Sequence, residues 1–101
     1  MSEKQRDRKV VWAPRARQAV DEIISREGSR AQEAVEAFEL FVARLPEAGF
    51  AVRGAPDFLG RPFHTDQHAY LVLYTFDAAV VECVGVRPIP YTAFDYSPDG
   101  E

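Results

Sequence analysis

The chain has 101 residues, of which 47% are hydrophobic and 28% are charged. This length fits one domain, and so high an apolar content is not that of a disordered chain. The net charge of −4 argues against a wholly basic nucleic-acid-binding protein, and a single cysteine, Cys83, excludes an internal disulfide and a cysteine-based zinc cluster. We expect one domain over 1–101, with its core at 9–91 and flexible ends at 1–8 and 97–101.

The chain shows no targeting signal, and its charge is uneven. No apolar run reaches the roughly 18 residues of a membrane-spanning helix. Residues 1–9 are polar, unlike a signal peptide, so we expect a cytoplasmic protein. Residues 1–30 carry a net charge of +3 and residues 31–101 a net charge of −7. An anion-binding surface would therefore need the N-terminal end or the few arginines that follow it.

The N-terminal part predicts a strand followed by two helices. Lys9–Trp12 is rich in residues that favour strands, and Pro14 is suited to the first turn of a helix that Gly28 ends. Ser29 and Gln32 fit a capping box at the start of a second helix, which Pro46 stops. Both helices are apolar on one side only, so we expect an antiparallel hairpin that packs on a sheet.

The C-terminal part predicts the sheet. Four segments are expected as strands, the first two weak and the last two strong: Phe50–Arg53, Asp57–Arg61, Ala69–Phe76 and Val80–Val86. Residues 62–67 are expected as a loop and 77–79 as a turn, while Pro88 and Pro90 are expected to end regular pairing. The predicted fold is α+β: a short N-terminal strand, an α-helical hairpin, and then a three- to four-stranded antiparallel sheet.

This order of elements, together with four segments, resembles the RelE/ParE family of small bacterial toxins. The family has a short strand ending in an aromatic residue, a helical hairpin, a leucine-proline-x-x-glycine turn and a tyrosine-x-valine-x-tyrosine strand before a valine-rich strand. The matching segments are VVWAPRARQAVDEII at 10–24, LPEAGF at 45–50, AYLVLYTF at 69–76 and VVECVGVRPIPY at 80–91.

The resemblance implies a toxin that is paired with an antitoxin protein. RelE-like members cut messenger RNA on the ribosome without a metal, whereas ParE-like members poison DNA gyrase and cut nothing themselves. The antitoxin usually wraps an extended or helical segment over the toxin's sheet and helices. The expected partners are thus an antitoxin and a gyrase or ribosome target, in a homodimer or a hetero-oligomer with the antitoxin, with no cofactor and no membrane.

The resemblance also implies candidate site residues. Metal-free RNA cleavage needs a base for the ribose 2′-OH, cations beside the phosphate and an acid for the leaving 5′-oxygen. The family places such residues on the sheet and just after its last strand. The matching catalytic candidates are Arg61, Arg87 and Tyr91, with His64 as a candidate base and Arg53 as a substrate-binding residue.

Three features depart from the family's ribonucleases. The chain is acidic, has no lysine after Lys9, and carries two prolines in its RPIPY segment at 87–91. These departures favour a toxin that acts by binding a cellular target and is neutralised by its antitoxin. Two alternatives stay open: a metal-free, ribosome-dependent endoribonuclease, and a non-toxic protein-interaction module of the same shape. Whether the chain is an enzyme is left open.

Other chemistry-bearing residues have simpler interpretations. His64, Asp66 and His68 alternate and would share one face of a strand, where they could ligate a metal. The segment is more typical of a loop, so no metal is predicted. Cys83 lies in a predicted strand and is expected to be a buried, inert thiol. The tail aromatics, from Tyr91 to Tyr96, would cover a sheet edge or form a protein-binding surface.

Overall fold

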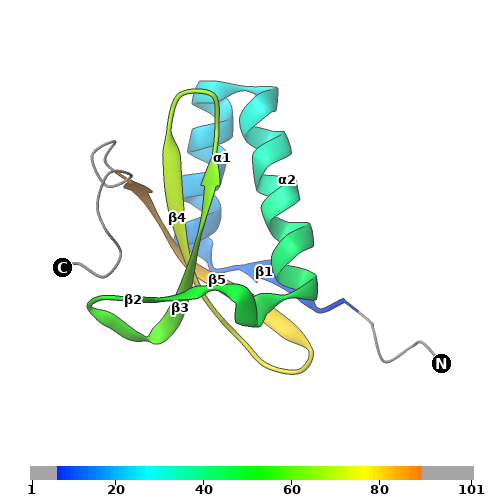
Figure 1. The fold of residues 1–101 in the computed structure, drawn as a ribbon. Helices are drawn as coiled ribbons and strands as arrows, with labels where there is room; N and C mark the ends of the chain where they lie inside the picture. Colours follow the sequence, from blue (N-terminus) through cyan, green and yellow to red (C-terminus); the bar gives the residue numbers. More distant parts are fainter. Residues whose placement is uncertain (1–6, 90–101) are drawn as a thin grey trace.

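The computed structural model describes residues 7–89, and it has the expected α+β class (Figure 1). Two helices precede most of the strands, and a 3₁₀ turn links the two parts. In chain order the elements are β1 (Lys9–Trp12), α1 (Pro14–Glu27), α2 (Ser29–Arg44), η2 (Pro46–Ala48), β2 (Phe50–Val52), β3 (Ala55–His64), β4 (Ala69–Phe76) and β5 (Val80–Ile89). Neither helix is both long and apolar enough to cross a membrane.

The sheet is mixed and has five strands, which corrects the predicted antiparallel sheet of three or four. Its strand order is β1-β5-β4-β3-β2. The four strands after the helices are antiparallel to their neighbours, but β1 pairs in parallel with β5, from Lys9 opposite Val80 to Trp12 opposite Cys83. The helical hairpin carries the chain back, so the first and last strands run the same way. A residue pattern identifies a strand but not its neighbour.

The helical hairpin forms as predicted, but its connection differs. Gly28, at φ +86°, is both the C-cap of α1 and the N-cap of α2. Its N–H donates to the carbonyl of Ile24 at 2.7 Å, and its carbonyl accepts the N–H of Gln32 at 3.2 Å. The predicted capping box is wrong because Ser29 is already the first helical residue. A glycine is needed because other residues rarely adopt this positive φ.

The helices cover one face of the sheet, and the core lies between the helices and that face (Figure 1). Phe38 of α2 lies at its centre, with ring centroids 5.9 Å from Trp12, 6.3 Å from Phe63 and 6.5 Å from Tyr74. Tyr74 is fully buried and donates its hydroxyl to the carbonyl of Pro46 at 2.5 Å. Burial raises the pKa of the Tyr74 hydroxyl, which is therefore a neutral donor.

Two strands are longer than predicted and contain proline. β3 runs through Pro62 to His64, and β5 runs through Pro88 to Ile89. Each proline lies beyond the neighbouring short strand, since β2 pairs with β3 only as far as Gly60 and β1 pairs with β5 only as far as Cys83. The missing N–H is tolerated at such an open edge. The predicted loop at 62–67 therefore shrinks to residues 65–68, while Pro90 lies outside the described residues.

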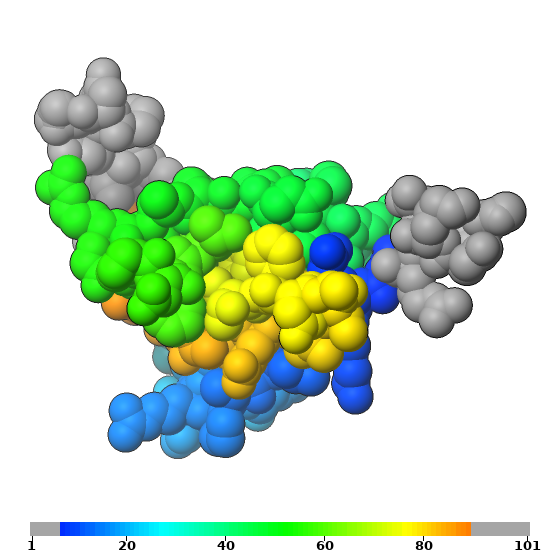
Figure 2. All heavy atoms as spheres, turned by 90° about the horizontal axis from the view of Figure 1, so that it is seen from below, coloured from blue at the N-terminus to red at the C-terminus, as the bar shows by residue number. Residues whose placement is uncertain are grey.

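The predicted turn at 77–79 is confirmed, and a side chain holds it. The Asp77 carboxylate accepts the backbone N–H of Ala79 at 2.8 Å and of Val80 at 2.9 Å. These bonds lower the pKa of the Asp77 carboxyl. Seen from below, this turn (yellow) lies between the β2–β3 segment (green) and the N-terminal elements (blue) in Figure 2.

The predicted burial of Cys83 is confirmed. Its side chain has no exposed surface, and burial raises the pKa of the thiol to about 12. The expected flexible end at 97–101 and the tail aromatics lie outside the described residues, as do residues 1–6. Arg8, expected in the other flexible end, donates its backbone N–H to the carbonyl of Ala43 at 3.0 Å. Its guanidinium carbon lies 5.3 Å from the centroid of Phe76.

Candidate functional site

The structure places Arg61 on the helix-covered face of the sheet. It lies opposite Val72, a fully buried core residue, in the pairing of β3 with β4. Its guanidinium carbon is 3.5 Å from the centroid of Phe41 on α2, a close cation–π contact. The two residues border a groove of about 370 Å³ between α2 and the part of β3 that extends beyond β2. Arg61 therefore presents its charge beside α2, at the edge of the core.

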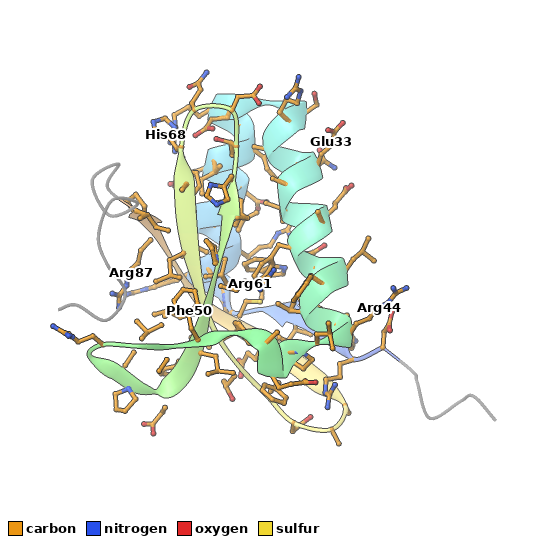
Figure 3. The ribbon with its side chains drawn as sticks, viewed as in Figure 1. Glu33, Arg44, Phe50, Arg61, His68 and Arg87 are labelled. Carbon is orange, nitrogen blue, oxygen red and sulfur yellow. The ribbon has the colours of Figure 1, made fainter. Side chains whose placement is uncertain are left out.

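Arg87 lies on the opposite face, which we call the open face because the helices do not cover it. It pairs with Leu71, the residue before Val72, and neighbouring residues of a strand point to opposite faces. Figure 3 shows Arg61 beside α2 and Arg87 on the side of the sheet away from α2. The structure thus separates two arginines that the resemblance implied for one site.

The remaining candidates are dispersed. Arg53 is exposed in the two-residue turn between β2 and β3. His64 ends β3, opposite Ala69, and is exposed. Tyr91 lies outside the described residues. The described candidates do not form one cluster.

The open face also carries apolar side chains that are exposed or half-buried. Phe50 is 50% exposed and pairs with Gly60. A side chain at Gly60 would meet those of Val52, Leu71 and Phe50, so this glycine leaves room for the three apolar groups to gather. Together with Arg87, opposite Leu71, they form an apolar patch with one cation.

A second cluster, which was not predicted, surrounds Glu27 at the end of α1. The tip of the β3–β4 hairpin lies beside the α1–α2 turn (Figure 1). Although its side chain is only 3% exposed, the Glu27 carboxylate accepts three hydrogen bonds. They come from the Thr65 hydroxyl at 2.5 Å, the Tyr70 hydroxyl at 2.5 Å and Nδ1 of His68 at 3.0 Å. These donors satisfy a carboxylate that is almost removed from water.

The hydrogen bonds keep Glu27 ionised. Burial by itself raises the pKa of the carboxyl, but the bonds from Thr65, Tyr70 and His68 outweigh it, and the pKa is lowered. Burial and the bond to Glu27 raise the pKa of the Tyr70 hydroxyl, which therefore stays protonated and donates. Arg26 donates to the same hydroxyl at 3.4 Å, a bond that raises the pKa of its guanidinium.

A pocket of about 320 Å³ adjoins this cluster. Its apolar residues come from α1 and β5: Ala19, Ile23, Val86 and Pro88. Its polar residues come from α1, the β3–β4 turn and β4: Glu22, Arg26, His68 and Tyr70. The arrangement combines an apolar cavity with an imidazole, a phenol and a guanidinium.

No local motif could have revealed this cluster, because its members are far apart in the sequence. Glu27 and Tyr70 are 43 positions apart, and Glu27 and Thr65 are 38 apart. The one available signal was a carboxylate in the last turn of a helix, where the macrodipole disfavours negative charge and a local partner is needed.

The residues considered for a metal site point to separate partners. Asp66 pairs with Arg30 at 2.8 Å, and His68 with Glu27 at 3.0 Å. Among residues 7–89, no group of three or more histidine, cysteine or acidic side chains is arranged to hold a metal ion.

The chain was compared with protein-family models, curated proteins and solved structures, and no match was found.

Proposed function

We propose that this chain is the toxin-type component of a toxin–antitoxin pair in the bacterial cytoplasm. It acts by binding a cellular target through the open face of its sheet, and a cognate antitoxin neutralises it. The observation that carries the proposal is a helical hairpin that covers one face of a five-stranded sheet and leaves the other with an apolar patch around Arg87.

The order of elements supports this proposal. A short strand ending in Trp12, a helical hairpin, a Leu45–Pro46 turn and a final antiparallel run of strands is the order that characterises the RelE/ParE family. Membership in that family is part of the proposal.

The open face supports a role in protein binding. Interfaces are enriched in aromatic and arginine side chains at their centres, and Phe50, Leu71 and Arg87 share this face. A target with a complementary apolar and acidic surface would bury Phe50 and pair with Arg87.

Binding is favoured over RNA cleavage because the candidate catalytic residues diverge. A cleaving site needs its base and cations within a few ångströms of one phosphate. Arg61 stacks on Phe41 on the covered face, whereas Arg87 lies on the open face. An acidic chain also lacks the broad positive potential that draws RNA.

The test is inducible expression in a bacterial host. We expect the wild-type chain to arrest growth and Arg87→Glu to relieve the arrest, because reversing a central charge weakens an interface by about tenfold or more. The matched control is Arg15→Glu, the same charge change at an exposed position on α1. It should still arrest growth, and both variants should retain the circular dichroism of the wild type.

Two outcomes would overturn the proposal. A wild-type chain that accumulates without slowing growth is not a toxin and fits the non-toxic interaction module instead. Equal relief of growth arrest by Arg15→Glu and Arg87→Glu would show that the open face is not the binding surface.

The endoribonuclease alternative makes a separate prediction. It requires new 5′ ends in messenger RNA during wild-type expression, and their loss in the double variant Arg87→Ala, Tyr91→Phe. Under the proposed binding role, messenger RNA stays intact while growth stops. Cleavage that disappears in the double variant would favour the endoribonuclease over the proposed binding role.

A further inference from the structure

A second site lies at the tip of the β3–β4 hairpin, apart from the open face. Nδ1 of His68 is 3.0 Å from Oε2 of Glu27, and the two side chains are 55% and 3% exposed. In Figure 3, His68 lies at the tip of the hairpin, beside the end of α1. We propose that this pair makes His68 a general base in the hydrolysis of small uncharged carboxylic esters, which bind in the adjacent pocket.

The hydrogen-bond pattern assigns the tautomer of His68. An ionised carboxylate only accepts hydrogen bonds, so Nδ1 must carry the proton. In the neutral imidazole the lone pair is then on Nε2, which points away from Glu27. Within residues 7–89 no hydrogen bond engages Nε2. A buried carboxylate orients the histidine of a Ser-His-Asp triad in the same way.

Glu27 is a positioning residue, and it is itself held firmly. Thr65 and Tyr70 donate to it at 2.5 Å each, so the carboxylate cannot turn away from His68. The Tyr70 ring stacks on Phe63 with centroids 5.3 Å apart, which fixes the second donor. Such support lowers the cost of ordering a catalytic pair at the moment of reaction.

The pocket favours an uncharged substrate. Its walls include Ile23, Val86 and Pro88, which suit a short aliphatic or aromatic group. The single guanidinium of Arg26 is accompanied by the carboxylates of Glu22 and Glu27, so a phosphodiester or another anion would meet repulsion. A neutral ester avoids this repulsion and still presents a carbonyl oxygen to Arg26.

The reaction uses water as the only co-reactant. Nε2 takes a proton from a water molecule, whose oxygen forms a bond to the ester carbonyl carbon while the carbonyl π electrons move to its oxygen. Arg26 stabilises the negative charge on that oxygen. When the carbonyl re-forms, the bond to the alcohol oxygen breaks, and the imidazolium returns its proton to the departing alkoxide. The products are a carboxylic acid and an alcohol, and nothing is oxidised or reduced.

The test is hydrolysis of p-nitrophenyl butyrate by the full chain. We expect His68→Asn to lower the rate by about 10²-fold or more, the usual contribution of a general base. Asparagine keeps an N–H donor for Glu27, so the fold should be retained. The matched control is His64→Asn, because His64 and His68 are the two histidines of the chain. It should keep the wild-type rate.

The positioning role of Glu27 has its own readout. Glu27→Gln should lower kcat with little change in KM, because it disturbs the orientation of His68 but leaves the shape of the pocket unchanged. Nitrogen NMR of the wild-type chain should show His68 with its proton on Nδ1, and Glu27→Gln should weaken this preference, because a neutral amide oxygen is a poorer acceptor than a carboxylate and the amide NH₂ can donate to Nδ1 instead. The measurement on the wild-type chain does not depend on whether a variant folds.

Three results would overturn the inference. They are a wild-type rate no higher than that of free imidazole at equal concentration, equal losses in His64→Asn and His68→Asn, and a His68 proton found on Nε2. The inference does not depend on the proposed function, since growth arrest tests the open face and ester hydrolysis tests the pocket.

Discussion

At the scale of single residues, Glu27 shows how the fold keeps a charge almost out of contact with water. Three donors from the β3–β4 hairpin and the start of β4 replace the water that the carboxylate loses. An uncompensated buried charge would cost far more than these bonds contribute. The same bonds tie the hairpin tip to the end of α1, so one side chain serves both charge balance and tertiary structure.

Glu27→Gln should therefore destabilise the protein in a pH-dependent way. We expect a loss of about 1–3 kcal/mol in the free energy of unfolding at neutral pH, because donors lose their charged acceptor. The folded-state pKa of Glu27 is lowered from its ordinary value of 4.5, so its contribution is complete above pH 4.5 and is lost as the pH falls through the folded-state pKa. Urea unfolding of both proteins from neutral to acidic pH measures this difference.

The control is Glu33→Gln, at an exposed position on α2 (Figure 3). It should leave the free energy of unfolding nearly unchanged. A difference between wild type and Glu27→Gln that stays constant into acid would contradict the hydrogen-bonded, ionised state of Glu27.

The buried thiol of Cys83 reports on opening of the core. Because the thiol is fully buried and its pKa is raised to about 12, the folded protein should react with a thiol reagent only through opening of the sheet. It is the single cysteine, so the signal comes from one site. Labelling should be slow in buffer and fast in denaturing urea. Fast labelling of the folded protein would contradict the burial.

At the scale of elements, the turn after α2 is fixed by a close approach to β4. Tyr74 donates to the carbonyl of Pro46, and Gly49 lies directly over the same hydroxyl. A side chain at Gly49 would collide with the Tyr74 hydroxyl and come within 2.9 Å of its ring carbon Cζ. This contact sets how η2 leads the chain into β2.

Gly49→Ala should accordingly lower the free energy of unfolding by about 1–3 kcal/mol, as overpacking does. Part of this loss should be relieved in a Tyr74→Phe background, where the colliding oxygen is gone. A double-mutant cycle measures this coupling. The control is Gly54→Ala, where nothing lies within 4 Å, although its φ of +85° adds a local backbone cost. That cost should be the same with Tyr74 or Phe at position 74.

The elements were predicted well wherever a local pattern determines them. Periodic apolar residues located both helices, and the run at 69–76 predicted β4 with its observed bounds. The errors arose where an adjacent strand or residue determines the bounds of an element. Pro88 stays within β5 because the edge beside it is open, and Ser29 is helical because Gly28 already caps α2. Neither condition can be read from a single segment.

At the scale of the whole molecule, the candidate sites depend on which residues share a face. The alternation along β3 and β5 already separates Arg61 from Arg87, but only once the register is known. The Glu27 cluster is harder still, because it forms only when the β3–β4 hairpin docks beside α1. The resemblance implied residues for one catalytic site, whereas the structure distributes those within residues 7–89 over two faces and a turn.

Trp12 allows a prediction about the molecule as one cooperative unit. It is the single tryptophan, it lies in β1, and it donates to Glu39 of α2 at 2.7 Å. Since β1 contacts both α2 and β5, thermal unfolding followed by tryptophan fluorescence and by circular dichroism should give the same midpoint. An earlier fluorescence transition would mean that β1 detaches before the sheet unfolds.

The parallel pairing of β1 with β5 also constrains the order of events during synthesis. β1 is synthesised before the helices, yet the segment that must pair with it, Val80–Cys83, is made only after the helices and three further strands. A product that stops before residue 80 would carry bare edges on β1 and β4, and such edges readily join other chains into aggregates. Translation must therefore pass residue 83 before the first strand obtains its permanent neighbour.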